Sequence, residues 1–169
     1  MRRSAIVAAV IAMVGLVGAG LAIASQRSGI VEAQTMSFAV GSGHEASADV
    51  GPSGDSPGDT FFSQSKLLNF ALTKQVGRYN SACDLENVTP RWNHCTATVF
   101  LPNGTLELSA RLIWTDTRPG YQLAVIGGTG RFANVVGQAR FTFGCDACPP
   151  DTQDVDTLTL YLVPSFERP

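Results

Sequence analysis

Charged side chains are scarce in this sequence, at 15% of 169 residues, where an average soluble domain has about 25%. Lysine occurs only as Lys66 and Lys74, and no run of basic residues exists. Proteins that bind nucleic acids contact phosphates mainly through clustered lysines and arginines. The composition therefore argues against a nucleic-acid partner. With 44% hydrophobic residues, the bulk of the chain is not expected to be disordered.

Helical patterns are missing as well, and a hydrolase motif has no supporting context. After residue 24, no stretch of ten or more residues repeats apolar positions at the helical spacing. The only histidines are His44 and His94. The one G-x-S-x-G match, at residues 54–58, lies in a Gly/Ser/Pro/Asp turn stretch and not in the strand-to-helix turn that presents a nucleophilic serine. We interpret both histidines as solvated or loop residues, and the sequence predicts no serine-hydrolase triad.

The first 24 residues have the pattern of an export signal. Arg2 and Arg3 precede an uncharged apolar segment that ends in Ala22-Ile23-Ala24, a small-x-small cleavage site. The sequence predicts a signal peptide at 1–24, a linker at 25–33 and one β-barrel domain at 34–165, in a secreted protein. An uncleaved membrane anchor is the alternative, since about 20 apolar residues can span a bilayer.

Four cysteines, Cys83, Cys95, Cys145 and Cys148, lie in the part of the chain that would leave the reducing compartment. An even number there indicates two disulfides, for which three pairings exist. We predict the pairs Cys83–Cys95 and Cys145–Cys148, and cross-pairing is the alternative. A zinc site that uses these cysteines and His94 is disfavoured in an oxidising compartment, so no metal is predicted.

The remaining chain reads as short strands. Met36, Phe38 and Val40 alternate with small or polar residues, and Pro102-Asn103-Gly104 supplies a hairpin turn. Further strands are predicted at 60–69, 76–83, 95–101, 105–114, 121–126, 135–144 and 155–163, with an irregular polar stretch at 84–93. The fold class is therefore all-β, an eight-stranded antiparallel β-barrel.

Apolar side chains alternate along several of these strands and would face the lumen, which is either packed solid or holds one apolar small molecule. The predicted inward residues are Leu106, Leu108, Leu112, Trp114, Phe141, Leu158 and Leu160. Trp114 and Phe141 are candidate ligand-binding residues. Asp49, Asp59 and Tyr79 are the polar candidates, since they lie near strand ends. Asp59 has an alternative role, because Gly-Asp at a strand start can bind the turn backbone.

The segment Gly128-Thr129-Gly130-Arg131-Phe132-Ala133 matches the G-x-G-x-x-A dinucleotide fingerprint. A helix and a βαβ unit must surround that fingerprint, and neither pattern occurs here. We therefore interpret the glycines as a tight turn between strands, and no nucleotide cofactor is predicted.

The same region carries a resemblance to a family. Ala124-Val125-Ile126-Gly127-Gly128-Thr129-Gly130-Arg131-Phe132, with Asp49-Val50-Gly51-Pro52 and the hairpin before Thr105, resembles a bacterial-type secreted member of the dirigent/allene oxide cyclase superfamily. The resemblance implies an eight-stranded barrel, often trimeric, with an apolar lumen for a hydrophobic small molecule. Plant dirigent proteins carry an acid and an arginine where this chain has Arg131 and Val136, which weighs against lignan-type coupling.

Two classes of function follow. The first is an isomerase-like or cyclase-like barrel, without metal or nucleotide cofactor, that confines an apolar reactive molecule and steers its cyclisation or coupling. The second is a non-catalytic extracellular barrel that binds a small molecule or serves a structural role.

Overall fold

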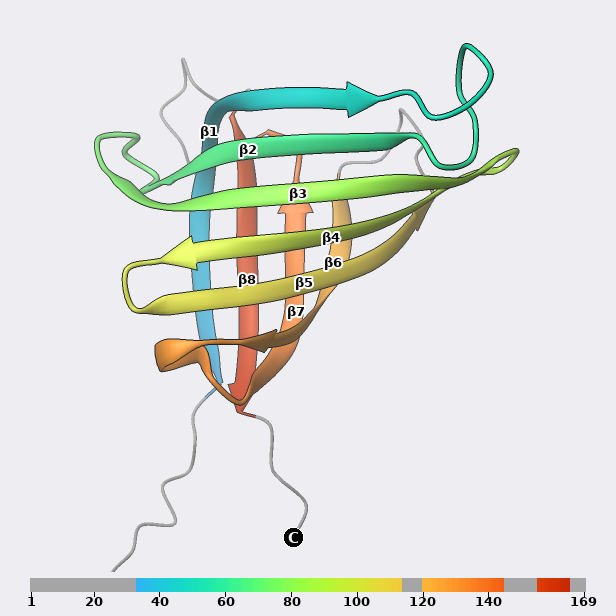
Figure 1. Cartoon of the computed structure of the whole chain (residues 1–169). Coiled ribbons are helices and arrows are strands. Elements are labelled where there is room, and N and C mark those ends of the chain that lie inside the picture. The colour runs from blue at the N-terminus through green and yellow to red at the C-terminus, as the bar shows by residue number, and fades with distance from the viewer. Residues whose placement is uncertain (1–32, 114–119, 145–154, 165–169) are drawn as a thin grey trace, which may run out of the picture. The chain divides into compact units, whose positions relative to one another are not determined.

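The computed structural model describes residues 33–113, 120–144 and 155–164. In these residues eight antiparallel strands close into one barrel (Figure 1), which confirms the predicted fold class. The strands are β1 (Gln34–Ala48), β2 (Thr60–Leu68), β3 (Gln75–Val88), β4 (Arg91–Leu101), β5 (Gly104–Ile113), β6 (Gly120–Gly128), β7 (Val135–Thr142) and β8 (Asp156–Pro164). The predicted leader, residues 1–24, lies outside the described residues. Within the described ranges, no helix has the length and apolarity needed to cross a membrane.

Each strand pairs with its neighbours in sequence, and β1 also pairs with β8. This closure satisfies the backbone groups that an open sheet would expose at its edges. Short connections between consecutive strands are sufficient for such an up-and-down order, which agrees with the closely spaced turns of the sequence.

The long strand β1 bends and pairs with two different strands. Its first part pairs with β8 and its second part with β2, and the register shifts between Val40 and Gly43. Figure 1 shows β1 turning at this point. A Cβ atom on Gly43 would lie 1.9 Å from the backbone oxygen of Gln64, so the close approach of β1 and β2 requires glycine here.

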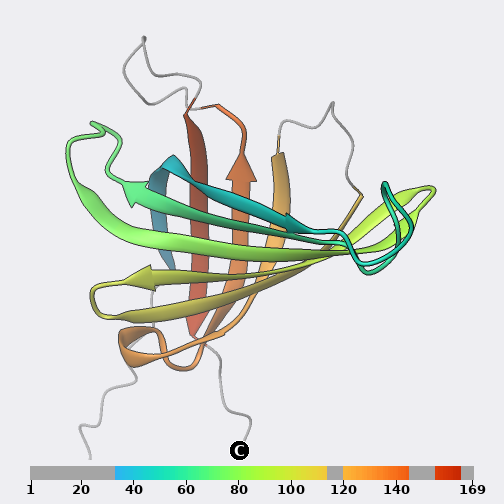
Figure 2. The same cartoon turned by 45° about the horizontal axis from the view of Figure 1, so that its top comes forward.

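The β3–β4 hairpin is longer than predicted. Residues 84–93 were expected to be irregular, but β3 continues to Val88 and β4 begins at Arg91, so this prediction is wrong. Polar side chains are tolerated because much of the extension is not covered by a core and is held by backbone pairing. The β1–β2 connection lies beside the hairpin (Figure 2), where the Leu85 backbone N–H donates a hydrogen bond of 2.8 Å to the Asp59 backbone oxygen.

Leucine side chains fill one part of the barrel interior. Leu106, Leu108, Leu158 and Leu160 are at most 1% exposed, as their alternation predicts. Complete burial of each such side chain contributes about 1.5–3 kcal/mol. The predicted inward residues Leu112 and Phe141 are buried too. This apolar core fixes the registers of β5 and β8, because a slip by one residue would turn every leucine outward.

The glycine-rich segment forms the β6–β7 turn. A short 3₁₀ helix spans Gly130–Phe132, and Phe132 is buried in the core. Gly130 has a φ of +60°, and its missing side chain allows the backbone N–H of Arg131 to donate to the Asn103 oxygen at 2.8 Å. This arrangement is a packed turn, as the sequence predicts, and it secures one end of the barrel.

Candidate ligand cavity

Side chains do not fill the rest of the lumen. A cavity of about 780 Å³ is lined by residues of β1, β2, β3, β4, β6, β7 and β8. The volume lies within the 300–1,000 Å³ that small-molecule sites usually have. The two sequence-based alternatives, a solid and a hollow lumen, therefore each describe one part of the barrel.

Four aromatic side chains gather on one wall of this cavity. Tyr121 and Phe141, which pair directly across β6 and β7, stack with ring centroids 5.0 Å apart. Tyr79 on β3 approaches the Phe141 ring at 5.9 Å, and Phe143 contacts the edge of the cluster at 5.7 Å. Such clusters offer flat apolar surface and, through tyrosine, a polar group at its margin.

The two phenols are held in their neutral form. Burial raises the pKa of Tyr79, and hydrogen bonds with Tyr121 and Ser81 offset part of this effect. Burial also raises the pKa of Tyr121, and the nearby Tyr79 and Asp156 raise it further. Both phenols therefore keep their protons at neutral pH, and a phenol O–H can donate to an acceptor in the cavity.

Asp156, at the start of β8, places a carboxyl group on the same cavity wall. It pairs with Val40 in register, and its Oδ1 accepts a hydrogen bond from the Gly144 N–H at 3.2 Å. Burial raises the pKa of Asp156, and the Gly144 bond only partly opposes this. A carboxyl group whose pKa is raised by burial beside neutral phenols is suited to exchange a proton with a bound molecule.

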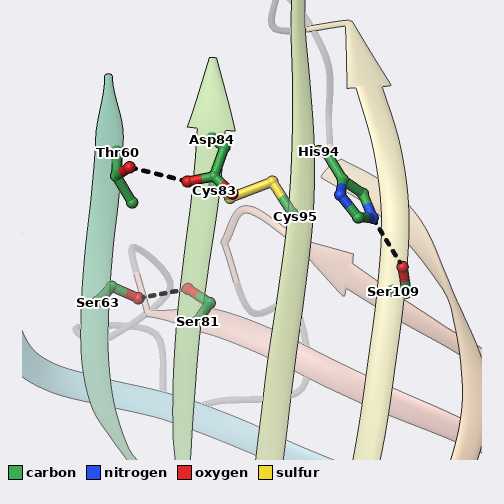
Figure 3. Close-up of a disulfide and its surroundings, with 8 residues drawn as sticks. All are labelled: Thr60, Ser63, Ser81, Cys83, Asp84, His94, Cys95 and Ser109. Carbon is green, nitrogen blue, oxygen red and sulfur yellow. Dashed lines mark hydrogen bonds between the residues drawn. A yellow bond between two sulfur atoms is a disulfide. The ribbon is translucent and has the colours of Figure 1, made fainter. Parts of the chain in front are cut away.

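Hydroxyl groups line the wall formed by β2 and β3. Ser63 and Ser81 lie opposite each other and share a hydrogen bond of 2.9 Å (Figure 3). Ser65 lies beside Tyr79 in the same register, and Glu45 faces Ser63 from β1. The cavity thus has one aromatic wall and one hydroxylated wall, which favours a ligand that is apolar on one side and oxygenated on the other.

The disulfide Cys83–Cys95 joins β3 to β4 beside this wall, as predicted (Figure 3). Disulfide-bonded sulfur atoms are not thiolate ligands, so Cys83 and Cys95 are not available to the alternative zinc site. His94 points away from the disulfide and lies 3.3 Å from the Ser109 hydroxyl. Cys145 and Cys148 lie outside the described residues. In the described ranges, no cluster of three or more His, Cys, Asp or Glu side chains could hold a metal ion.

At the far part of the cavity lie Arg91 and Asn93 of β4 and Phe61 of β2. The Arg91 Nη1 atom forms a 2.8 Å ion pair with Asp55. Its guanidinium lies 5.5 Å from the centroid of the Phe61 ring. Asn93 is 2% exposed. These contacts hold β4 against the β1–β2 connection and place two nitrogen-bearing side chains on the cavity wall.

The sequence-predicted site residues have different outcomes. Tyr79 and Phe141 lie together on the cavity wall. Asp49 is exposed and Asp59 is buried, and neither is part of that wall. The Asp59 carboxylate accepts hydrogen bonds from the Val50 and Ser56 N–H groups at 2.9 and 2.8 Å, which is the alternative turn role. Trp114 lies outside the described residues.

Sequence reasoning missed Tyr121 and Asp156. Asp156 has the same parity as Leu158 and Leu160, which alternation already placed inside. Tyr121 has the same parity as Leu123 on β6, which is buried. The sequence could have indicated both residues, because each is a polar residue that alternates in step with inward apolar residues of its own strand.

The two departures from the plant dirigent pattern lie away from the cavity. Arg131 is exposed on the β6–β7 turn, and Val136 is 37% exposed on β7. Neither residue lines the cavity. The acid and arginine missing at these positions therefore leave no gap in the cavity wall of this chain.

No protein-family model and no curated protein matches the chain. Among solved structures, a pyocyanin demethylase is similar at 29% identity and a TM-score of 0.60, over 77% of this chain and 100% of that one. The Diels-Alderase AbmU from Streptomyces koyangensis is 14% identical (TM-score 0.60), over 77% of this chain and 64% of that one. The pterocarpan synthase dirigent protein GePTS1 is 15% identical (TM-score 0.56), over 82% and 88%. The predicted dirigent-like and cyclase-like barrel is thus confirmed at the level of the fold.

Proposed function

We propose that this barrel binds a planar, largely apolar small molecule in its cavity and steers a proton-dependent rearrangement or cyclisation of that molecule. The observation that carries the proposal is the joint placement of Tyr79, Tyr121 and Asp156 beside the stacked Phe141 ring. Aromatic surface positions a flat ligand, and the three polar groups provide protons where that ligand would lie.

The proposed ligand is an aromatic or conjugated ring system with at least one oxygen substituent. The Tyr79 hydroxyl would donate to that oxygen and stabilise charge that develops on it, as preorganised donors do in water-poor sites. Asp156 would take up or deliver the proton. The solved structure most similar in sequence among those described above is named for pyocyanin, a planar tricyclic molecule with an exocyclic oxygen, and this supports the same ligand class.

Binding of pyocyanin to the purified full chain tests this proposal. We expect saturable quenching of protein fluorescence, and liquid chromatography of the incubated ligand would separate an isomeric product, which has the same mass as pyocyanin. Tyr121→Phe and Asp156→Asn should reduce conversion more than binding. Absence of saturable binding would contradict the proposal.

A non-catalytic binding protein is the second candidate. It is favoured by the hydrogen bond of the Asp156 Oδ1 atom with the Gly144 N–H, which gives the carboxyl group a structural partner. In that case, pyocyanin would bind and be recovered unchanged, and both variants would affect only its affinity.

We also propose export and self-association. The leader pattern and the Cys83–Cys95 disulfide support export, and an intact mass without residues 1–24 from the native host would establish it. An exposed apolar strip on β6, β7 and β8, formed by Ile126, Val136 and Val163, supports contact with further copies. Native mass spectrometry should show a trimer that Val163→Lys dissociates.

A further inference from the structure

Two nitrogen donors on the wall of the cavity have no partner. The Asn93 Nδ2 and Arg91 Nε atoms are both buried, and neither forms a hydrogen bond in the structure of the described chain. The two residues are separated by one position on β4, so their side chains leave the same face of the strand. Both line the cavity.

Asn93 is the stronger indicator of a ligand. Asn93 is only 2% exposed. Buried amide groups in native proteins nearly always have hydrogen-bond partners. Its neighbours in register, Leu85 and Leu112, offer only apolar side chains. An acceptor from outside the protein would satisfy this group.

Arg91 is oriented rather than free. Asp55 binds its Nη1 atom, and the Phe61 ring lies beside the guanidinium plane. These contacts leave the Nε edge for another acceptor. The pair formed by Nε and Nη2 is one of the edges that bind a carboxylate with two parallel hydrogen bonds.

Positive and negative side chains lie at different parts of the cavity wall. Arg91 lies at one part of the wall, whereas the Asp156 carboxyl group lies with the tyrosines at another. Glu45 lies between them, in the row of Ser63. A carboxylate would be repelled by Asp156 and Glu45 and attracted to Arg91.

The strand register gives the distance between the Asn93 part of the cavity and the part that holds the tyrosines. Val99 is the residue of β4 directly opposite Tyr79, and Asn93 lies six residues before it along the strand. At about 3.4 Å per residue, the backbone distance is about 20 Å. A single compact ring cannot reach both parts, but an elongated molecule can.

We infer that Asn93 and Arg91 form an acceptor subsite for the terminal carboxylate of an elongated ligand whose ring end lies against Tyr79 and Tyr121. This inference rests on the proposed function and specifies its ligand class as a ring system that carries an acid at its far end.

Dansylaminoundecanoate and its methyl ester test the subsite. The dansyl ring matches the aromatic wall and reports an apolar surrounding by its emission, and only the acid carries the carboxylate. We expect the full chain to bind the acid at least tenfold more tightly than the ester, the change expected from a charge-assisted hydrogen bond. Arg91→Gln should remove most of this preference, because only the carboxylate gains from the guanidinium charge. Asn93→Leu should weaken the binding of both probes, since an ester carbonyl also accepts a hydrogen bond from the amide.

Two control variants isolate the cause. Asn80→Leu removes another amide that has an unpartnered buried atom but does not line the cavity, so the preference should persist. Asp55→Asn breaks the ion pair with Arg91 and keeps the guanidinium, so the acid should still be preferred.

The outcomes separate the subsite from the proposed function. Equal binding of acid and ester with a blue-shifted emission would overturn the subsite while the cavity function stands. Binding of neither probe would overturn both. If Asn93→Leu does not fold, an undiminished preference in Arg91→Gln would still overturn the inference.

Discussion

The rings of Tyr121 and Phe141 lie almost parallel, at an angle of 2° with centroids 5.0 Å apart. The two residues are twenty positions apart in sequence and directly opposite in the register of β6 and β7. Their contact therefore depends on the β6–β7 turn, which sets the register. The turn at one end of the barrel positions the aromatic wall at the other.

Tyr121→Phe tests the hydroxyl separately from the ring. Stacking on Phe141 is retained, so we expect the free energy of unfolding to change by no more than about 1.5 kcal/mol, the usual net value of one hydrogen bond. Conversion of a bound ligand should fall, because one of the proposed proton-bearing groups of the cavity is lost. Denaturant unfolding and pyocyanin turnover measure the two effects. Tyr161→Phe is the matched control, since Tyr161 is 47% exposed on the outer face of β8.

Asp156→Asn is expected to stabilise the protein at neutral pH. Burial raises the pKa of Asp156 in the folded state, so folding binds a proton more tightly than the unfolded chain does. The charged carboxylate therefore costs stability once the pH exceeds its unfolded value. The gain in melting temperature should be present at pH 7 and vanish below about pH 4. A gain that persisted at acid pH would point to another cause.

Asp59→Asn is expected to have the opposite sign. Hydrogen bonds from the Val50 and Ser56 N–H groups lower the pKa of Asp59 in the folded state. Its ionised form therefore stabilises the fold at neutral pH, and this contribution is lost as the pH falls through the lowered folded pKa. Melting curves of the variant and the parent protein should differ at pH 7 and converge in strong acid. Asp49→Asn, at an exposed position of the same connection, should match the parent throughout.

The sequence was sufficient for the barrel but only partly for the cavity. Alternation identified the inward leucines and Phe141, because period-two patterns report directly which face is buried. It missed the extended β3–β4 hairpin, since residues 84–93 have no apolar stripe and are ordered by backbone pairing. Conversely, Asp59 satisfied the positional rule for a cavity residue and instead binds its own turn.

Distances across the lumen are the part that the sequence could not provide. Tyr79 and Tyr121 meet because the sheet closes between β8 and β1 and because β1 bends after Val40. The bend appears in the sequence only as Gly41-Ser42-Gly43, a pattern that also occurs in loops. Which strands curve inward, and how far, depends on closure of the whole sheet.

Gly43→Ala tests whether this bend shapes the cavity. The added Cβ atom would lie 1.9 Å from the Gln64 backbone oxygen, a distance that forces β1 and β2 apart. We expect a loss of about 1–3 kcal/mol or more, as for other overpacked sites, and weaker ligand binding because Gly43 lines the cavity. Gly127→Ala is the matched control, since its Cβ would meet no atom within 4 Å. If both variants unfold at the same denaturant concentration and bind pyocyanin equally, the contact between β1 and β2 does not set the shape of the site.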